Sequence, residues 1–72
     1  NKVVGEIIRE LRVSHHVSQE KLAEAINSHQ VYISEIESGK KLPSLIILQS
    51  IASFFGISLT ELIHKIENQL CS

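Results

Sequence analysis

The 72-residue chain has no tryptophan and no methionine, and only 4% of its residues are aromatic. Its hydrophobic core must therefore be built mainly from isoleucine, leucine, valine and alanine, within an apolar fraction of 43%. A chain of this length forms one small domain, which buries about 60% of the surface that its unfolded form exposes. We therefore expect a single domain over residues 1–72, of modest stability.

Cysteine is nearly absent, since Cys71 is the single one. It cannot close an internal disulfide, which fits a reducing compartment. Serine, glutamine and charged residues interrupt the apolar runs, so we expect no membrane span and no signal peptide. These features predict a soluble, cytoplasmic protein with no membrane partner. Asn1 stands in place of a starting methionine, which indicates a processed, trimmed or excised chain.

Aspartate is absent altogether, and no glycine-rich phosphate loop is present. No arrangement of a nucleophile and a base can be drawn, because Ser18 and Ser58 are better explained as helix caps. We therefore expect no catalytic residue, no cofactor and no small-molecule substrate.

A metal site is also disfavoured. His15, His16, Glu20 and His64 are the only candidate ligands that suggest one. His16 and Glu20 stand four residues apart, but a predicted helix break at residues 17–18 separates them. No fourth ligand stands at a defined spacing. We expect no metal and interpret His15 and His16 as loop residues.

Positive charge is not in surplus. Seven lysines and arginines against eight glutamates give a net charge of −1 and an isoelectric point near 6.5. This balance counts against nucleic-acid binding, for which a basic domain is typical. A local basic edge can be enough, however, because backbone contacts involve few side chains. Lys40 and Lys41 supply such an edge, although Glu35 and Glu37 dilute it.

Apolar residues recur at helical spacing along the whole chain, and no segment shows the alternation of a strand. Ser18 is placed to cap one helix, and Asn27, Gly39 and Gly56 are placed to end three. Pro43 stands where the first residue of a helix is preferred. We predict five helices, at about 3–14, 19–26, 30–38, 43–55 and 59–69.

The second and third of these helices form a unit with the turn between them. Asn27 is the non-glycine residue that best tolerates the left-handed conformation that a sharp turn requires. Ile33 and Ile36 are the expected buried pair of the third helix, whereas Gln30 and its polar neighbours face solvent. Two short helices, the second displaying hydrogen-bonding groups, are typical of a DNA-reading helix-turn-helix.

Four blocks of the sequence strengthen this interpretation: GEIIRELR, SQEKLAEAI, YISEIESGKKLPS and LQSIASFFGISLTEL. From Val4 to about Ile63 the chain resembles the Cro-like and phage-repressor-like regulators of the xenobiotic response element family. The resemblance implies an all-α fold of five helices, similar to lambda repressor, with the helix-turn-helix at the second and third helices. It also implies sequence-specific binding to double-stranded DNA.

The resemblance assigns roles to individual positions. Those expected to face base edges are Gln30, Val31, Ser34 and Glu35. Those expected near the DNA backbone are Gln19, Tyr32, Ser38, Lys40 and Lys41. Arg12 and Glu37 match an ion pair that ties the first helix to the end of the third. Among the base readers we favour Gln30, because a glutamine amide can pair with both polar groups of adenine.

The chain also departs from the family at three positions of the unit. Asn27 replaces the usual glycine, a tolerable change. His29 replaces a serine or threonine, so the third helix is capped by Ser28 or is less well capped. Glu35 replaces a common arginine or lysine, so it either accepts from cytosine or penalises other bases.

The apolar surface predicts a homodimer on a pseudo-palindromic site, with recognition helices about 34 Å apart. The candidate dimer residues are Ile46, Phe54, Ile66 and Leu70; alternatively, the C-terminal helix folds back on its own core. Two other functions stay open. One is a protein-interaction module of the same fold, antitoxin-like or regulator-binding, with weak or no DNA binding. The other is the N-terminal reader domain of a longer regulator.

Overall fold

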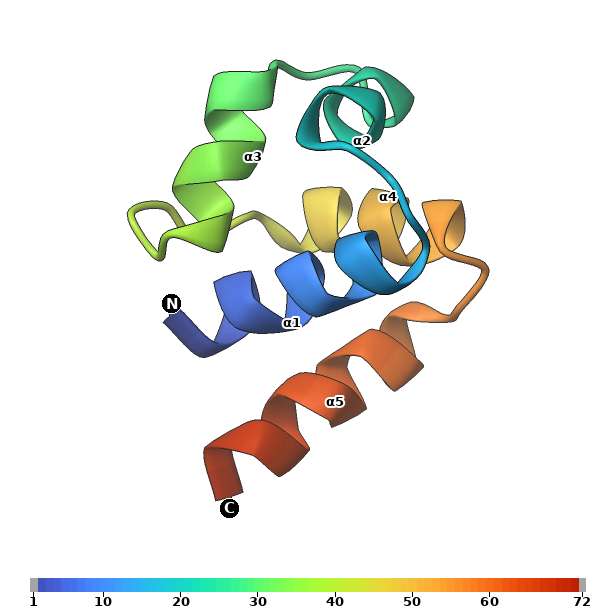
Figure 1. Cartoon of the computed structure of the whole chain (residues 1–72). Helices are drawn as coiled ribbons and strands as arrows, with labels where there is room; N and C mark the ends of the chain where they lie inside the picture. Colours follow the sequence, from blue (N-terminus) through green and yellow to red (C-terminus); the bar gives the residue numbers. More distant parts are fainter. Residues whose placement is uncertain (1, 72) are drawn as a thin grey trace.

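A computed structural model of the protein describes residues 2–71 (Figure 1). It contains α1 (Lys2–Ser14), α2 (Gln19–Ala25), α3 (Gln30–Glu37), α4 (Leu45–Phe54) and α5 (Leu59–Cys71). Between residues 2 and 71 there is no strand, and the prediction of an all-α, five-helix fold is confirmed. The interpretation of Asn1, like the last residue of the expected 1–72 domain, lies outside the described residues.

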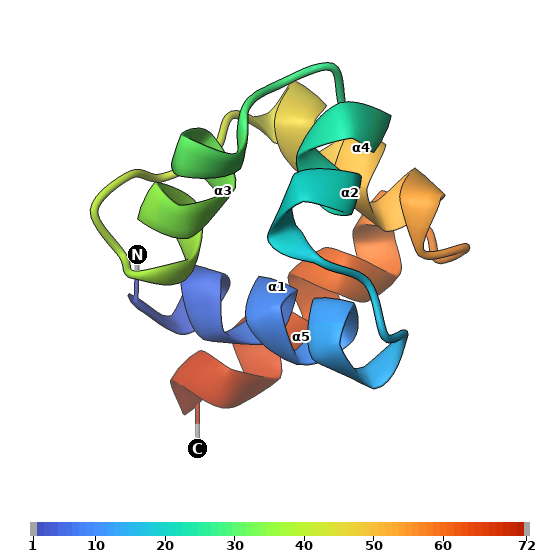
Figure 2. The same ribbon diagram turned by 45° about the horizontal axis from the view of Figure 1, so that its top comes forward.

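Helix α1 lies in the middle of the molecule, with α2 and α3 on one side and α5 on the other (Figure 1). The view turned by 45° shows α2 and α3 side by side above α1, with α4 behind them (Figure 2). This arrangement leaves the outer face of α3 uncovered by any other helix. Within residues 2–71 no single helix is long and apolar enough to cross a membrane. Helices α4 and α5 reach that length and apolar content only when they are taken together, and the chain bends by 106° between them.

All five helices contribute to one hydrophobic core, and the core is aliphatic apart from Phe55. Its side chains with almost no exposed surface are Ile8, Leu22, Ile33, Ile36, Ile51 and Leu62. Ile66 also lies in this core, at 8% exposure. The expectation that Ile66 belongs to a dimer surface is therefore wrong for this residue, because the last helix packs it against the monomer's own core.

The C-terminal ends of α1, α2, α3 and α4 share one geometry. In each, the residue after the cap adopts a positive φ: His16 (57°), Asn27 (59°), Gly39 (85°) and Gly56 (74°). The N–H groups of this residue and of the one after it donate to carbonyls of the helix. After α2, Asn27 donates to the Glu24 carbonyl at 3.1 Å and Ser28 to the Ala23 carbonyl at 2.8 Å. This is the Schellman motif, which satisfies carbonyls that a helix end leaves unpaired. The predicted left-handed Asn27 is present.

The N-terminal ends of the helices differ in quality. The Ser18 and Ser58 hydroxyls accept from Lys21 and Glu61 N–H, at 3.0 and 3.1 Å, and both act as the expected caps. Helix α3 begins after His29, whose side chain makes no cap hydrogen bond. The sequence left two alternatives for this helix, a Ser28 cap or a poorer cap, and the structure has the poorer cap.

Helix α4 begins at Leu45, so the prediction that Pro43 is its first residue is wrong. Ser44 is the cap instead, and its hydroxyl accepts from Ile47 N–H at 3.2 Å. A serine cap satisfies a free backbone N–H group at the helix start, whereas proline at the first position only removes one such group. Pro43 is buried just before the helix and directs the chain into it.

Candidate nucleic-acid interface

The outer face of α3 and the start of α2 form one open surface. A depression of about 450 Å³ lies there. Its lining residues are Gln19, Gln30, Val31, Ser34, Glu35 and Lys40. All four side chains that the sequence assigned to base edges therefore line a single surface, together with two that it assigned to the DNA backbone.

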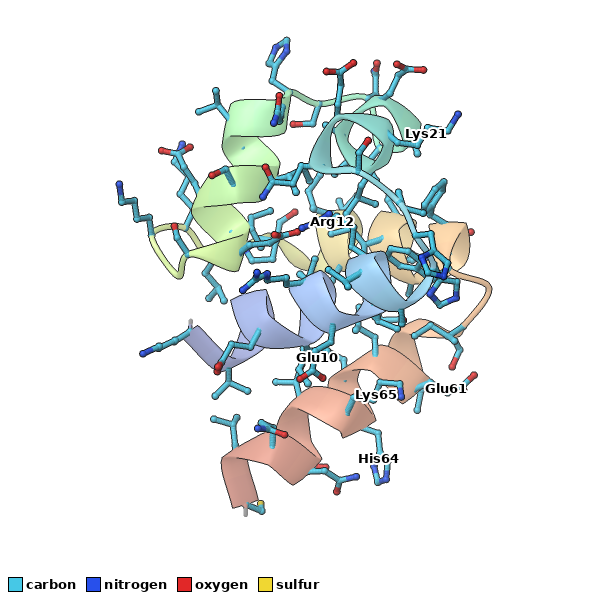
Figure 3. All side chains as sticks on the ribbon, in the orientation of Figure 1. Glu10, Arg12, Lys21, Glu61, His64 and Lys65 are labelled. Carbon is cyan, nitrogen blue, oxygen red and sulfur yellow. The ribbon has the colours of Figure 1, made fainter. Side chains whose placement is uncertain are left out.

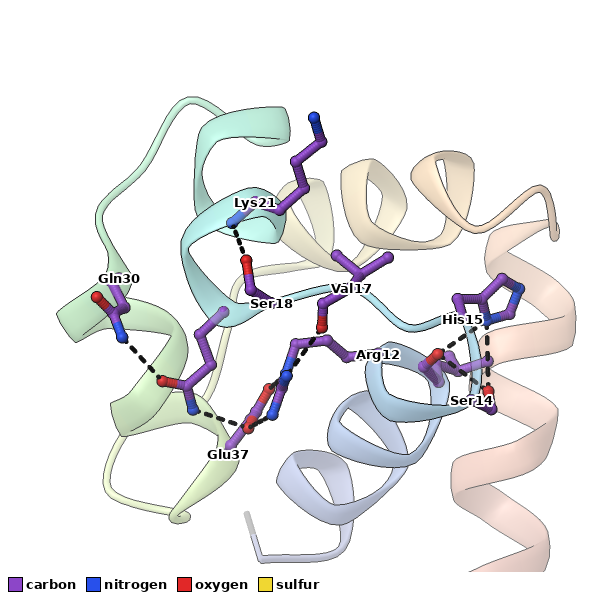
Figure 4. A network of polar contacts seen from close by, with 10 residues as sticks. Arg12, Ser14, His15, Val17, Ser18, Lys21, Gln30 and Glu37 are labelled. Atoms are coloured by element: carbon purple, nitrogen blue, oxygen red, sulfur yellow. Dashed lines mark hydrogen bonds and ion pairs between the residues drawn. The ribbon is translucent and has the colours of Figure 1, made fainter.

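A chain of polar contacts connects this surface to the interior (Figure 4). The Arg12 guanidinium donates to both carboxylate oxygens of Glu37, at 2.7 and 3.1 Å, and to the carbonyl of Val17, at 2.9 Å. Glu37 Oε1 also accepts from Gln19 Nε2, at 3.0 Å. Gln19 Oε1 in turn accepts from Gln30 Nε2, at 3.4 Å. The pairs link α1, the end of α3, the start of α2 and the start of α3.

The expected ion pair between Arg12 and Glu37 is well shielded from water. The two side chains are 14% and 5% exposed. Arg12 projects from α1 toward α2 and α3 (Figure 3). A buried charge needs several partners to offset its lost hydration, and Glu37 has two here. The pair therefore fixes the angle at which α3 leaves the body of the protein.

The contact between Gln19 and Glu37 was not predicted from the sequence. The residues stand eighteen positions apart on different helices, and no spacing rule joins them. The resemblance places Gln19 at the DNA backbone, and in the structure its Oε1 also accepts from Gln30 Nε2. Because one Nε2 hydrogen of Gln30 points at Gln19, the other hydrogen and Oε1 remain for a ligand.

The loop after α3 carries the basic edge. Lys40 and Lys41 are exposed, as is Ser38, whose hydroxyl donates to the Glu35 carbonyl at 3.2 Å. The backbone of Lys2 packs against this loop, since a Cβ on Gly39 would lie 3.3 Å from the Lys2 Cα. The start of α1 thus lies against the loop that carries Lys40 and Lys41, although it is far away in the sequence.

Tyr32 and Glu35 shape the same edge. Tyr32 is half-buried against the core, and the Lys41 ammonium lies 5.9 Å from the centre of its ring. That ammonium is also 3.5 Å from Glu35 Oε1. The acidic residue that the sequence placed on the reading face is therefore paired with a lysine assigned to the DNA backbone.

The remaining dimer candidates lie on different surfaces. Ile46 (75% exposed) and Phe54 line one depression on the outer side of α4, together with Ala25 of α2. Leu70 is exposed in the last turns of α5.

His15 has partners within the chain. The His15 ring lies 4.9 Å from that of Phe55, and its Nδ1 is 2.8 Å from the Leu11 carbonyl. His64 lies on α5, across α1 from α2 (Figure 3). Between residues 2 and 71 no three histidine, cysteine or acidic side chains gather in a way that could hold a metal ion.

Two short helices joined through a left-handed Asn27, with a polar outer face and a lysine-containing loop, define a helix-turn-helix of the DNA-binding, transcription-regulating class. Comparison with known proteins gives the family. The helix-turn-helix family model HTH_3 matches residues 8–62. The chain therefore belongs to the helix-turn-helix family of the xenobiotic response element type, as its sequence blocks suggested.

Relatives and solved structures agree with this assignment. Control protein C.MunI of Mycoplasma sp is 42% identical over 53 residues, which cover 74% of this chain and 72% of that protein. Control protein C.BamHI of Bacillus amyloliquefaciens is 37% identical over 60 residues, covering 82% and 74%. The restriction-modification controller protein C.AhdI from Aeromonas hydrophila superimposes with a TM-score of 0.79, at 31% identity, over 85% of this chain and 92% of that one.

Proposed function

We propose that the protein binds a pseudo-palindromic DNA site as a homodimer, with α3 in the major groove and Gln30 reading a base. The observation that carries this proposal is the single depression lined by Gln30, Val31, Ser34 and Glu35. A helix end with outward polar side chains fits a major groove about 12 Å wide. Relatives named as control proteins support a role in controlling transcription from that site.

The oriented amide of Gln30 favours adenine. Adenine presents an acceptor, N7, and a donor, the N6 amino group, in the major groove. Gln30 retains one Nε2 hydrogen for N7 and Oε1 for the amino group while its other hydrogen stays on Gln19. Guanine presents two acceptors instead, so the fixed Oε1 would face another oxygen.

Contacts to the DNA backbone come from the two sides of the depression. Lys40 and Lys41, with Tyr32 and Ser38, lie at the loop side, and Gln19 lies at the start of α2. A protein-interaction module without DNA binding would need a negative face here. Glu37 is buried in its ion pair, whereas Lys40 and Lys41 are exposed, which supports DNA binding.

The outer side of α4 supports the homodimer. Residues 42–60 carry no charged side chain, so two copies of this face would not repel each other. The face exposes Ile46 and Phe54 around one depression. A two-fold dimer uses the same patch on both subunits, which suits such an uncharged surface.

Selection from a pool of randomised duplexes at two salt concentrations tests the proposal. The protein is expected to enrich a two-fold symmetric motif with adenine in each half-site. Binding should weaken as salt rises, because lysine contacts to phosphates release counterions. Enrichment of no motif, with no salt-sensitive binding, would contradict the proposal and favour a protein-interaction module.

A further inference from the structure

Lys41 is held by two groups of α3. Its ammonium lies 3.5 Å from Glu35 Oε1 and 5.9 Å from the centre of the Tyr32 ring. The Lys41 and Glu35 side chains are 57% and 33% exposed, so water screens the pair and its partners exchange readily. The Lys41 ammonium, which could pair with a DNA phosphate, is therefore already paired within the protein, but only weakly.

The backbone keeps these two residues together. The N–H groups of Lys40 and Lys41 both donate to the carbonyl of Glu35, at 2.9 and 3.2 Å. Gly39, at a φ of 85°, closes the turn between them. Because the loop is anchored on Glu35 itself, a rotation of the Glu35 side chain changes the partner of Lys41 without moving the loop.

Glu35 also faces the reading surface, since it lines the depression with Gln30, Val31 and Ser34. A carboxylate only accepts hydrogen bonds. In the major groove its characteristic partner is the N4 amino group of cytosine, whereas thymine and guanine present acceptor oxygens at the corresponding edge. Glu35 thus has one partner inside the protein, Lys41, and on DNA it can pair only with amino groups, of which N4 of cytosine is the characteristic one.

We propose that Glu35 couples recognition of cytosine to phosphate binding by Lys41, an inference that rests on the proposed function. Where a cytosine meets Glu35, the carboxylate turns to accept from N4, and Lys41 is released to a phosphate. Where thymine stands there, the carboxylate stays with Lys41, and the complex lacks one phosphate contact. The same cytosine would then strengthen binding in two ways, through its hydrogen bond to Glu35 and through the phosphate contact of the released Lys41.

Salt dependence tests this coupling, because each phosphate contact contributes about 0.9 to the slope of log K against log salt concentration. Selections with the wild type and with Glu35→Gln first identify the base pair whose cytosine preference depends on Glu35. Binding to the selected duplex is then compared with binding to one in which that cytosine is replaced by thymine.

We expect the wild-type slope to be shallower on the thymine duplex, by about 0.9 for each half-site changed. In Glu35→Gln and in Lys41→Gln the two duplexes should give equal slopes. Lys40→Gln is the matched control. It should make the slopes on both duplexes shallower and keep the difference between them.

Equal wild-type slopes on the two duplexes would overturn the coupling, and so would a difference that persists in Lys41→Gln. A cytosine preference unchanged in Glu35→Gln would overturn it as well. Failure of the proposed function looks different, because the wild type would then show no salt-sensitive binding to any duplex, and the coupling would fall with it.

Discussion

Gln30 is linked, through Gln19, to an ion pair that does not line the surface it faces. Its Nε2 donates to Gln19, Gln19 donates to Glu37, and Arg12 holds Glu37 in place. A side chain whose amide is already turned loses less rotational freedom on binding, so it discriminates better for the same contacts. Positioning of the base reader is thus linked to an ion pair in the interior.

Glu37→Gln should therefore lower both stability and base discrimination. Removing one charge from a buried pair costs about 3–5 kcal/mol, because Arg12 is left without its counter-charge. Urea denaturation measures the loss. Glu35→Gln is the control, since its exposed pair with Lys41 is worth under about 1 kcal/mol. Equal losses in the two variants would contradict a buried, stabilising pair.

Residue roles could be predicted where a motif fixed them. The pair of Arg12 and Glu37 and the surface positions around Gln30 followed from the resemblance of the sequence to a family. The bond from Gln19 to Glu37 did not, because it depends on how two helices cross. The pairing of Glu35 with Lys41 also went unforeseen, since it is made by the turn at Gly39.

The helices were predictable mainly through their ends. Ser18, Asn27, Gly39 and Gly56 act where the sequence placed them, because caps and left-handed turns depend on local chemistry. His16, at a φ of 57°, was not recognised, although histidine is one of the non-glycine residues enriched in that conformation.

The start of α4 shows where local chemistry offers two solutions. Both Pro43 at the first position and Ser44 as a cap are acceptable at a helix start. The structure uses Ser44, and Pro43 is buried before it. Burial of a proline depends on the rest of the fold, which its neighbours in the sequence do not define.

The crossing of α1 and α3 depends on Gly5. A Cβ at this position would collide with the carbonyl oxygen of Ile36 and would lie 2.7 Å from that of Glu37. Gly5→Ala should therefore force the helices apart, weaken the ion pair of Glu37, and cost about 1–3 kcal/mol or more.

Gly56→Ala is the matched control for Gly5→Ala. A Cβ on Gly56 meets nothing within 4 Å, so the substitution costs only the strain of its positive φ, about 1–2 kcal/mol. Thermal denaturation of both variants, together with DNA binding, separates the two effects. Gly5→Ala should impair DNA binding, and Gly56→Ala should not. Normal binding by a stable Gly5→Ala variant would show that the close crossing is dispensable.

For the molecule as a whole, the arrangement around α1 divides the surface into a reading side and other sides. Lys21 on α2 and Lys65 on α5 lie on opposite sides of α1 (Figure 3). The five-helix fold was predictable, because apolar residues recur at helical spacing and caps and left-handed turns mark the helix ends. The packing of Ile66 was not, since an apolar residue near the end of α5 fits either a core or a dimer surface equally well.

The uncharged outer side of α4 is the proposed dimer surface. Ile46→Asp should place a charge against its own copy and weaken the dimer about tenfold or more, as removal of a buried apolar anchor does at other interfaces. Sedimentation of the free protein measures the change. Val13→Asp, an equally polar change at an exposed valine of α1, should leave the dimer intact. An unchanged dimer in Ile46→Asp would place the interface elsewhere.

The most direct test of the role of α3 is selection from randomised duplexes by Gln30→Ala beside Asn68→Ala, a control at an exposed residue of α5, across α1 from α3. Gln30→Ala should lose the adenine preference at one position of each half-site, worth about 1–3 kcal/mol, and keep the rest of the motif. Asn68→Ala should enrich the wild-type motif unchanged. An unaltered motif from Gln30→Ala would contradict the claim that the amide at the start of α3 reads the DNA.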